Sequence, residues 1–265
     1  MVYGRFSAGL CGLALFFFAQ PSRSATDIRA ELQRADQLED SDRLTEALQV
    51  LKTAEQSDPE NPEILYRISN VNSELVDVTS DDKQKEAYAQ TALKYAKRAV
   101  EKAPNSSDAH LSLAIASGKI TDFVDNRTKM EYSRVIQREA EKAVQLSSKN
   151  DLAYLVLAKW NFEMSNLNPI LRGIAQMIYG QVPPSSQVKA VEYFKKAISI
   201  APNQIAHHFA YAQALDRMGK KEEARAEYQK VLQLTATDRE DREDQKEAAK
   251  ALKRQNPSPS FRERS

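Results

Sequence analysis

Cysteine, histidine and glycine are all scarce in this chain. Its 265 residues include one Cys, three His and seven Gly. A single Cys excludes an internal disulfide, and three His leave too few ligands for a His-rich metal site. We therefore expect no metal and no cofactor, and a fold that is stabilised by its hydrophobic core alone.

A charge excess of either sign is also missing. Lys and Arg together number 38, against 37 Asp and Glu, so the chain has no strong positive field to attract a nucleic-acid backbone. The sequence also lacks H-E-x-x-H, G-x-S-x-G, G-x-G-x-x-G and P-loop motifs, which accompany hydrolytic and nucleotide chemistry. We predict a protein that has no enzymatic activity and no nucleic-acid partner.

Residues 1–24 have the pattern of a secretory signal peptide. An apolar run from Phe6 to Ala19 follows Arg5 and contains the only thiol, that of Cys11. Small residues follow this run, which predicts cleavage near Ser24 and export to the periplasm or the cell exterior. The alternative is a membrane anchor, although the run is shorter than the roughly 20 residues of a helical span.

The rest of the chain repeats one pattern five times. Four positions recur with steps of four, three and five residues, and the first copy is Ala47, Leu51, Ala54 and Pro59. The other copies begin at Ala92, Ile136, Ala190 and Ala224. The first three positions share one face of a helix, and a Pro at the fourth cannot continue it. Small Ala side chains on that face allow a second helix to pack closely.

A second amphipathic stretch precedes each copy and supplies that partner helix. These stretches are Asp27–Leu38, Pro62–Leu75, Ser107–Ser117, Asp151–Met164 and Ile205–Met218. The last hairpin fills the 34 residues of a tetratricopeptide (TPR) unit. We predict an all-α, right-handed superhelical solenoid of TPR-like hairpins, in which residues 165–180 of the fourth unit add an extra, buried helix.

The repeats also predict how the chain is divided. After the signal peptide (1–24), residues 25–61 form the first hairpin and N-terminal cap, 62–238 form repeats two to five, and 239–254 form a charged capping helix. The tail 255–265 has too few apolar residues to fold. We expect Glu39 to lie on the outer side of the first unit, and the charged run 238–246 to be a solvated helix face.

The first helices of such a solenoid line its concave face, with their second, fifth, ninth and twelfth positions pointing inward. The candidate groove residues at these positions are Tyr66, Asn70, Leu111, Ile115, Leu155, Lys159, Phe162, Phe209 and Gln213. Their apolar members predict a groove for a protein partner or an apolar ligand. The alternative is that the insertion in the fourth unit folds back over these side chains and makes them part of the core.

The histidines and the single Trp are expected to be structural. His207 and His208 are adjacent, so they point about 100° apart on a helix and cannot share a metal ion. We expect one of them to pack inward and the other to border the groove. We expect His110 to be partly buried and Trp160 to lie in the core.

The fourth unit resembles the regulator of microtubule dynamics family. The similarity rests on the segments Ala158–Leu167, Tyr179–Pro184 and Ala190–Ala197, and it extends over residues 62–253. This resemblance implies a helical-repeat adaptor that is associated with microtubules or membrane contact sites. It also implies a phospholipid ligand, which the repeat domain of the tethering member binds.

Overall fold

The computed structural model describes residues 25–180 and 185–255. Within those ranges the chain forms twelve α-helices, one 3-10 helix and no β-strand. None of these helices combines the length and the apolar character needed to cross a membrane. The predicted signal peptide, and residues 256–265 of the predicted tail, lie outside the described residues.

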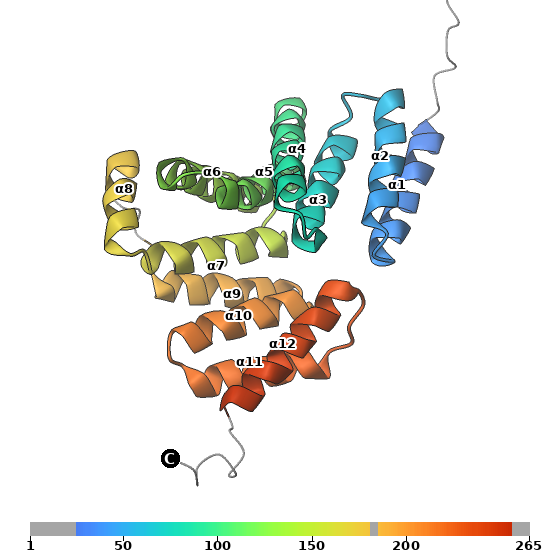
Figure 1. Cartoon of the computed structure of the whole chain (residues 1–265). Coiled ribbons are helices and arrows are strands. Elements are labelled where there is room, and N and C mark those ends of the chain that lie inside the picture. Colours follow the sequence, from blue (N-terminus) through green and yellow to red (C-terminus); the bar gives the residue numbers. More distant parts are fainter. Residues whose placement is uncertain (1–24, 181–184, 256–265) are drawn as a thin grey trace, which may run out of the picture.

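The helices pair into antiparallel hairpins that stack into a curved superhelix (Figure 1). Their bounds are α1 Ala25–Asp40, α2 Leu44–Ser57, α3 Pro62–Val78, α4 Asp82–Lys102, α5 Ser107–Lys119, η1 Ile120–Phe123, α6 Asn126–Leu146, α7 Asp151–Ser165, α8 Pro169–Tyr179, α9 Gln187–Ile200, α10 Ile205–Arg217, α11 Lys221–Gln233 and α12 Arg239–Gln255. Within the hairpins α1 packs on α2, α3 on α4, α5 on α6, α7 on α9, and α10 on α11. The predicted all-α helical-repeat solenoid is confirmed.

Polar side chains set the start of most helices. Asn61 accepts hydrogen bonds from the backbone N–H groups of Glu63 and Ile64, and Pro62 occupies the first turn of α3. The other side chains that cap helices in this way are Asp81, Ser106, Asp125, Asn150, Asn168 and Ser186. Each cap stabilises its helix by about 1 kcal/mol and helps to fix the residue at which that helix begins.

The recurring small residues lie in the contacts between helices. All the alanines at the first three positions of the repeat are fully buried, at 0% exposure. They are Ala47, Ala54, Ala92, Ala96, Ala99, Ala140, Ala143, Ala190, Ala197 and Ala224. Larger side chains occupy some of the same positions and are also buried, as Leu51 and Phe194 are. The recurring alanines therefore pack between helices, as the pattern predicts.

The additional residues of the second and third units mainly lengthen helices. Helices α4 and α6 contain 21 residues each, whereas α11 of the last unit contains 13. The insertion of the fourth unit instead forms α8, which packs on α6 at one edge of the molecule (Figure 1). Only one side of α8 is covered, since Ile170 and Met177 are 71% and 78% exposed. The expectation of a buried extra helix is therefore wrong.

The C-terminal helix α12 joins the two ends of the superhelix. Ala248 and Ala251 pack into the core formed by α10 and α11. At the start of α12, Arg242 donates a hydrogen bond of 2.9 Å to Asp42, in the turn between α1 and α2. Arg239 lies 3.8 Å from the same carboxylate. The last helix thus meets the first hairpin and encloses an inner side of the molecule (Figure 1).

Candidate functional site

Charged side chains gather on this inner side, between α12 and the first helices of the hairpins. We call them the inner charged cluster: Glu39, Glu74, Asp77, Lys119, Lys159, Glu240 and Asp244. They come from α1, α3, α5, α7 and α12, and they act electrostatically on one another. Five are acids and two are lysines, so the cluster is negative when every group is ionised.

Helix periodicity explains much of this cluster. Glu74 and Lys119 lie four residues after Asn70 and Ile115, on the same helix face and one turn further along. The equivalent positions of α7 and α10 are Glu163 and Arg217, which form an ion pair. Lys119 is likewise paired with Asp77. One of the two lysines of the cluster is thus paired with a carboxylate of the same cluster, and the acids still outnumber the cations.

The pKa of Glu74 lies well above that of a free carboxyl. Burial raises it to about 8, and the charges of Glu39, Glu240 and Asp77 act in the same direction. Lys119 opposes this effect without cancelling it. The Glu74 carboxyl is therefore largely protonated at neutral pH and would ionise more readily beside an additional cation.

Other members of the cluster are shifted for the same reason. Burial, followed by the charge of Asp36, raises the pKa of Glu39 to about 7. Burial and Glu240 together raise the pKa of Asp244 to about 7. Lys159 is accessible to solvent but has protein on several sides, and this enclosure lowers the pKa of its amine. Within the described chain Lys159 forms no ion pair.

The nine residues predicted to line a groove fall into two groups. Leu111, Leu155 and Phe162 are only 7%, 6% and 3% exposed, because neighbouring helices pack on them. The more accessible members are Tyr66, Asn70, Ile115, Lys159, Phe209 and Gln213. Helix α8 packs on α6, so the burial of the apolar group comes from adjacent hairpins. The role of these nine residues in binding stays a prediction.

Several charged residues of the inner side are missing from that predicted set. Glu39 faces the inner charged cluster and not the outer side of the first unit, so that expectation is wrong. Glu240 and Asp244 also belong to the cluster, which corrects the interpretation of 238–246 as a merely solvated face. The predicted groove positions continue one helical turn further along α3 and α5, where Glu74 and Lys119 lie.

The two adjacent histidines are both buried. His207 and His208 are 1% and 5% exposed, so the expectation that one borders a groove is wrong. His207 Nε2 lies 2.7 Å from the Asp151 carboxylate and links α10 to α7. Burial lowers the pKa of His208, but hydrogen bonds to Glu227 and the Pro202 carbonyl outweigh it and raise the pKa overall. Both histidines therefore join helices.

His110 occupies the equivalent position of the third unit and has equivalent partners. Its Nδ1 lies 2.5 Å from Glu139, and its Nε2 donates to the Pro104 carbonyl at 2.9 Å. The side chain is 7% exposed, more deeply buried than expected. Among the described residues no group of three or more His, Cys, Asp or Glu is arranged to hold a metal ion.

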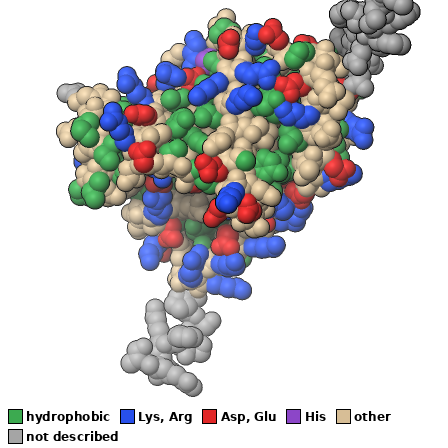
Figure 2. Space-filling model, turned by 45° about the horizontal axis from the view of Figure 1, so that its top comes forward, with side chains coloured by type: hydrophobic (Ala, Val, Ile, Leu, Met, Phe, Trp, Pro, Cys, Tyr) green, Lys and Arg blue, Asp and Glu red, His purple; other side chains and the backbone are tan. Residues whose placement is uncertain are grey.

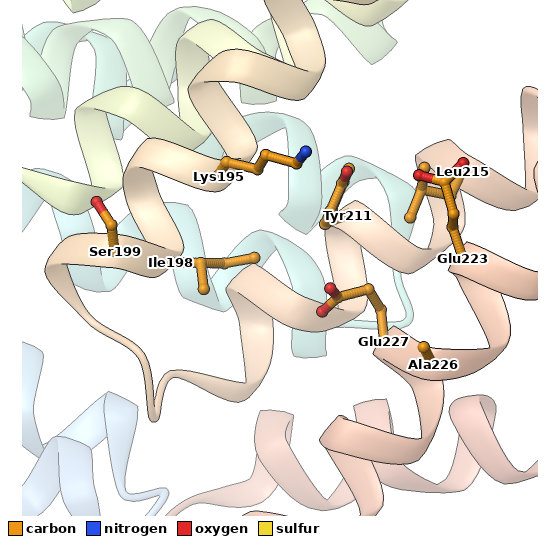
Figure 3. Close-up of a pocket in the computed structure, with 8 residues that line it drawn as sticks. All are labelled: Lys195, Ile198, Ser199, Tyr211, Leu215, Glu223, Ala226 and Glu227. Atoms are coloured by element: carbon orange, nitrogen blue, oxygen red, sulfur yellow. The ribbon is translucent and has the colours of Figure 1, made fainter.

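A hollow of about 360 Å³ lies between α9, α10 and α11 (Figure 3). Lys195 and Ser199 line it from α9, and Glu223 and Glu227 line it from α11. Burial and these two carboxylates raise the pKa of Tyr211 to about 12. Its hydroxyl therefore stays protonated at neutral pH and can donate a hydrogen bond, but it cannot act as a base.

Comparison with solved structures supports the fold. A thermophilic TPR protein of Thermus thermophilus superposes with a TM-score of 0.63 and 20% sequence identity, over 85% of this chain and 98% of that protein. At this identity the similarity establishes the helical-repeat architecture alone.

Sequence comparison identifies the family. Regulator of microtubule dynamics protein 1 of Bos taurus is 27% identical over 235 residues, which cover 86% of this chain and 72% of the relative. Regulator of microtubule dynamics protein 2 of Mus musculus is 24% identical over 223 residues, or 83% of this chain. The match spans about half of that mouse relative, 54%. Since residues 31–256 match the family model described as "Regulator of microtubule dynamics protein 1-3", the chain belongs to this family.

Proposed function

We propose that this protein is a non-enzymatic scaffold whose inner charged cluster binds a basic segment of a protein partner. The observation that carries the proposal is the surplus of carboxylates on the enclosed side of the superhelix. Burial raises the pKa values of Glu74 and Asp244, and the neighbouring carboxylates raise them further, so negative charge is costly at this site. A Lys or Arg side chain from a partner would reduce that cost and gain favourable ion pairs.

The helical-repeat architecture favours a peptide segment as the ligand. Stacked hairpins present their first helices as an extended concave surface, which suits an elongated chain. Along this surface Gln213 is exposed, and the Oδ1 atom of Asn70 is a buried acceptor without a hydrogen-bond partner in the described chain. A backbone or side-chain N–H of the ligand would satisfy that acceptor.

Fluorescence anisotropy with labelled peptides tests this function. We expect a Lys/Arg-rich 12-residue peptide to bind the full chain, and its Glu-rich counterpart not to bind. Reversing the charge of the cluster in Glu74→Lys/Asp244→Lys should weaken this binding by about 100-fold. The matched control is Glu101→Lys/Glu222→Lys, because both side chains are exposed acids outside the cluster. Equal losses in the two double variants would mean general charge attraction and would contradict the proposal.

Export is proposed from the pattern of residues 1–24. Cleavage near Ser24 would deliver the repeats outside the cytoplasm and remove Cys11 from the mature chain. Sequencing the N-terminus of the native protein provides the test. A start near Ala25 supports export, whereas an intact N-terminus supports the membrane-anchored alternative.

Microtubule binding is a second candidate function, which family membership favours. Cosedimentation of the full chain with polymerised tubulin measures it directly. If the protein pellets with microtubules, Glu74→Lys/Asp244→Lys distinguishes binding through the inner charged cluster from binding through another surface. Absence from the pellet at physiological salt would leave the relatives' named role without support in this protein.

The apolar ligand or phospholipid implied by the resemblance is less compatible with the inner side. Leu111, Leu155 and Phe162 are occupied in helix contacts, so few apolar side chains are available to an acyl chain there. Mass spectrometry of lipids extracted from the purified protein is the appropriate measurement. Phospholipid at one molecule per chain would favour the lipid-binding alternative over a peptide-binding scaffold.

A further inference from the structure

A second hollow lies on the outer edge of the molecule, between α6 and α8. Its volume is about 380 Å³. We call it the α6–α8 groove, and its lining residues are Arg127, Glu131, Arg134, Ile174, Met177 and Ile178. One wall is charged and comes from α6, while the other is apolar and comes from α8. The groove shares no residue with the inner charged cluster, so a ligand bound there is independent of the proposed function.

The outward face of α8 is unusually apolar for a solvent-exposed surface. Ile170 and Met177 are seven residues apart, hence on one face of the helix, and are 71% and 78% exposed. The opposite face is held in place, because Ala175 is fully buried against Trp160. Figure 2 shows hydrophobic side chains on the left flank of the molecule, where α8 lies, with Lys or Arg side chains beside them. A firmly packed helix thus presents an uncovered apolar row.

Positive charge borders this apolar row. Arg134 on α6 and Arg172 on α8 are exposed, and neither forms an ion pair within the described chain. Arg134 is close enough to the end of α8 for its charge to act on Tyr179. Arg127 is 3.4 Å from Glu131 and is partly compensated. These uncompensated cations favour a partner that carries carboxylates beside its apolar surface.

We propose that the α6–α8 groove binds an amphipathic helix of a protein partner that carries carboxylates beside its apolar face. Its apolar side chains would pack against Ile174 in the groove and against the exposed row of Ile170 and Met177. Its carboxylates would pair with Arg134 and Arg172. A channel between two helices is a common receptor for a third helix. The flexible side chain of Met177 adapts to different apolar partners.

Two other occupants fit these features less well. An anionic membrane is planar and would leave the hollow unfilled. A second copy of this chain would place uncompensated Arg134 and Arg172 of one protomer near those of the other. A separate acidic, amphipathic helix meets neither obstacle.

Binding of designed peptides to the full chain tests this proposal. The probe is a labelled 18-residue helical peptide with Leu at i, i+3, i+4 and i+7 spacing and Glu on the flanks of that stripe. A second peptide has Lys in place of each Glu, and a third keeps the Glu residues but has its Leu residues dispersed around the helix. We expect the first peptide alone to bind, because it alone combines the apolar stripe with carboxylates.

Variants of exposed residues locate the binding. Ile170→Gln/Met177→Gln should weaken the first peptide roughly 10- to 100-fold, since two apolar contacts are lost. Arg134→Glu should weaken it about 10-fold and allow the Lys-flanked peptide to bind. Leu232→Gln is the matched control, because Leu232 is also an exposed apolar residue, on α11, and this change should leave the affinity unaltered.

Several results would overturn the proposal. The proposal would be wrong if the Glu-flanked peptide did not bind or if all three peptides bound equally. It would also be wrong if binding persisted in both Ile170→Gln/Met177→Gln and Arg134→Glu. Cosedimentation with phosphatidylserine vesicles that is lost in Ile170→Gln/Met177→Gln would assign the surface to a membrane instead. Dimerisation in sedimentation velocity that is lost in the same variant would assign it to a second copy of the chain.

Discussion

The inner charged cluster and the α6–α8 groove differ in how they are built as well as in their charge. The cluster draws side chains from five helices and includes positions as far apart as Glu39 and Asp244. The groove depends on one insertion in one repeat. Closure of the whole superhelix therefore creates the acidic surface, whereas a local addition creates the apolar and basic surface.

The two surfaces should therefore respond differently to change. Charges in the cluster are enclosed, so they interact strongly and shift one another's pKa values. The arginines of the groove are exposed to solvent, where salt screens them over about 8–10 Å. We expect ligand binding at the cluster to depend on pH and on the position of α12. We expect ligand binding at the groove to depend on its apolar side chains and on the packing beneath α8.

The largest expected effect comes from removing the support of α8. Trp160 packs with Met130, Met164 and Ala175, and its Nε1–H donates to the Ser133 carbonyl at 2.9 Å. Trp160→Ala leaves a large cavity and should lower the free energy of unfolding by about 3–5 kcal/mol. Urea denaturation followed by far-UV circular dichroism measures this loss.

The same variant separates the two surfaces if the protein stays folded. Trp160→Ala should abolish binding of the Glu-flanked amphipathic peptide, because α8 loses the surface on which it packs. Binding of the Lys/Arg-rich peptide to the inner charged cluster should change less than threefold. If Trp160→Ala keeps its native helicity but loses the binding of both peptides, the two surfaces are not independent.

The next largest effect concerns the charge of the inner cluster. Glu74→Lys/Asp244→Lys should weaken the Lys/Arg-rich peptide by about 100-fold, equivalent to roughly 2.7 kcal/mol. Titration calorimetry provides the affinity and also the number of protons released. Because the raised pKa of Glu74 should fall beside a bound cation, binding near pH 7 should release protons. Met177→Gln should alter neither quantity.

Sequence periodicity is sufficient to predict the hairpins but not the orientation of α8. The spacing of Ala190, Phe194 and Ala197 identifies one helix face without ambiguity. In α8, by contrast, apolar residues lie on both the buried and the exposed side, as Ala175 and Met177 illustrate. Arg172 and Gln176 form only a narrow polar strip on α8, and the apolar arc is wider than the contact with α6, so the hydrophobic periodicity does not show which part of that arc is buried.

The sequence pattern predicts only part of the inner charged cluster. Glu74 and Lys119 continue rows that the repeat pattern already defines. Glu240 and Asp244 do not, because their position opposite Glu74 requires the superhelix to curve until α12 meets α1 and α2. Contacts between Arg242 and Asp42, which are 200 residues apart, depend on the summed angles of every hairpin, and no local pattern encodes them.

A smaller effect is expected on the pH dependence of stability. The pKa of Glu74 is about 8 in the folded protein and about 4.3 in an unfolded chain. Between these values the folded state retains a proton that the unfolded state has lost, so the free energy of unfolding falls as pH rises. Glu74→Gln should raise it by about 1–2 kcal/mol at pH 8, after solvent screening, and have little effect at pH 4.

Urea denaturation at pH 4, 6 and 8 checks this sign. The control is Glu101→Gln, because Glu101 is an exposed acid outside the inner cluster, and it should follow the wild-type pH profile. Met177→Gln should also leave the pH dependence of the free energy of unfolding unchanged, since Met177 lies outside the inner charged cluster. Stability that increases from pH 5 to pH 8 in the wild type, and equally in Glu74→Gln, would contradict the assignment of raised pKa values to the cluster.

The smallest expected effect on stability comes from the ion pairs that join α12 to the first hairpin. Asp42→Asn removes the charge that Arg239 and Arg242 share, and Asn tolerates the positive φ of 59° at this position. These pairs are partly exposed, so their loss should cost only about 0–1 kcal/mol. Asp42→Asn should nevertheless weaken the pH dependence of stability. Without these ion pairs the start of α12 would move away from the first hairpin, and Glu240 and Asp244 would move away from Glu74 with it.

The matched control for this closure is Glu46→Gln, which removes the ion pair between Arg43 and Glu46 on the same hairpin. It should cost a similar amount without changing the pH profile, since neither side chain belongs to the inner charged cluster. If Asp42→Asn also leaves the profile unchanged, the packing of Ala248 and Ala251 against α10 and α11 is sufficient to position α12. Closure would then be a property of the apolar core, and the acidic surface would persist without the ion pairs at its edge.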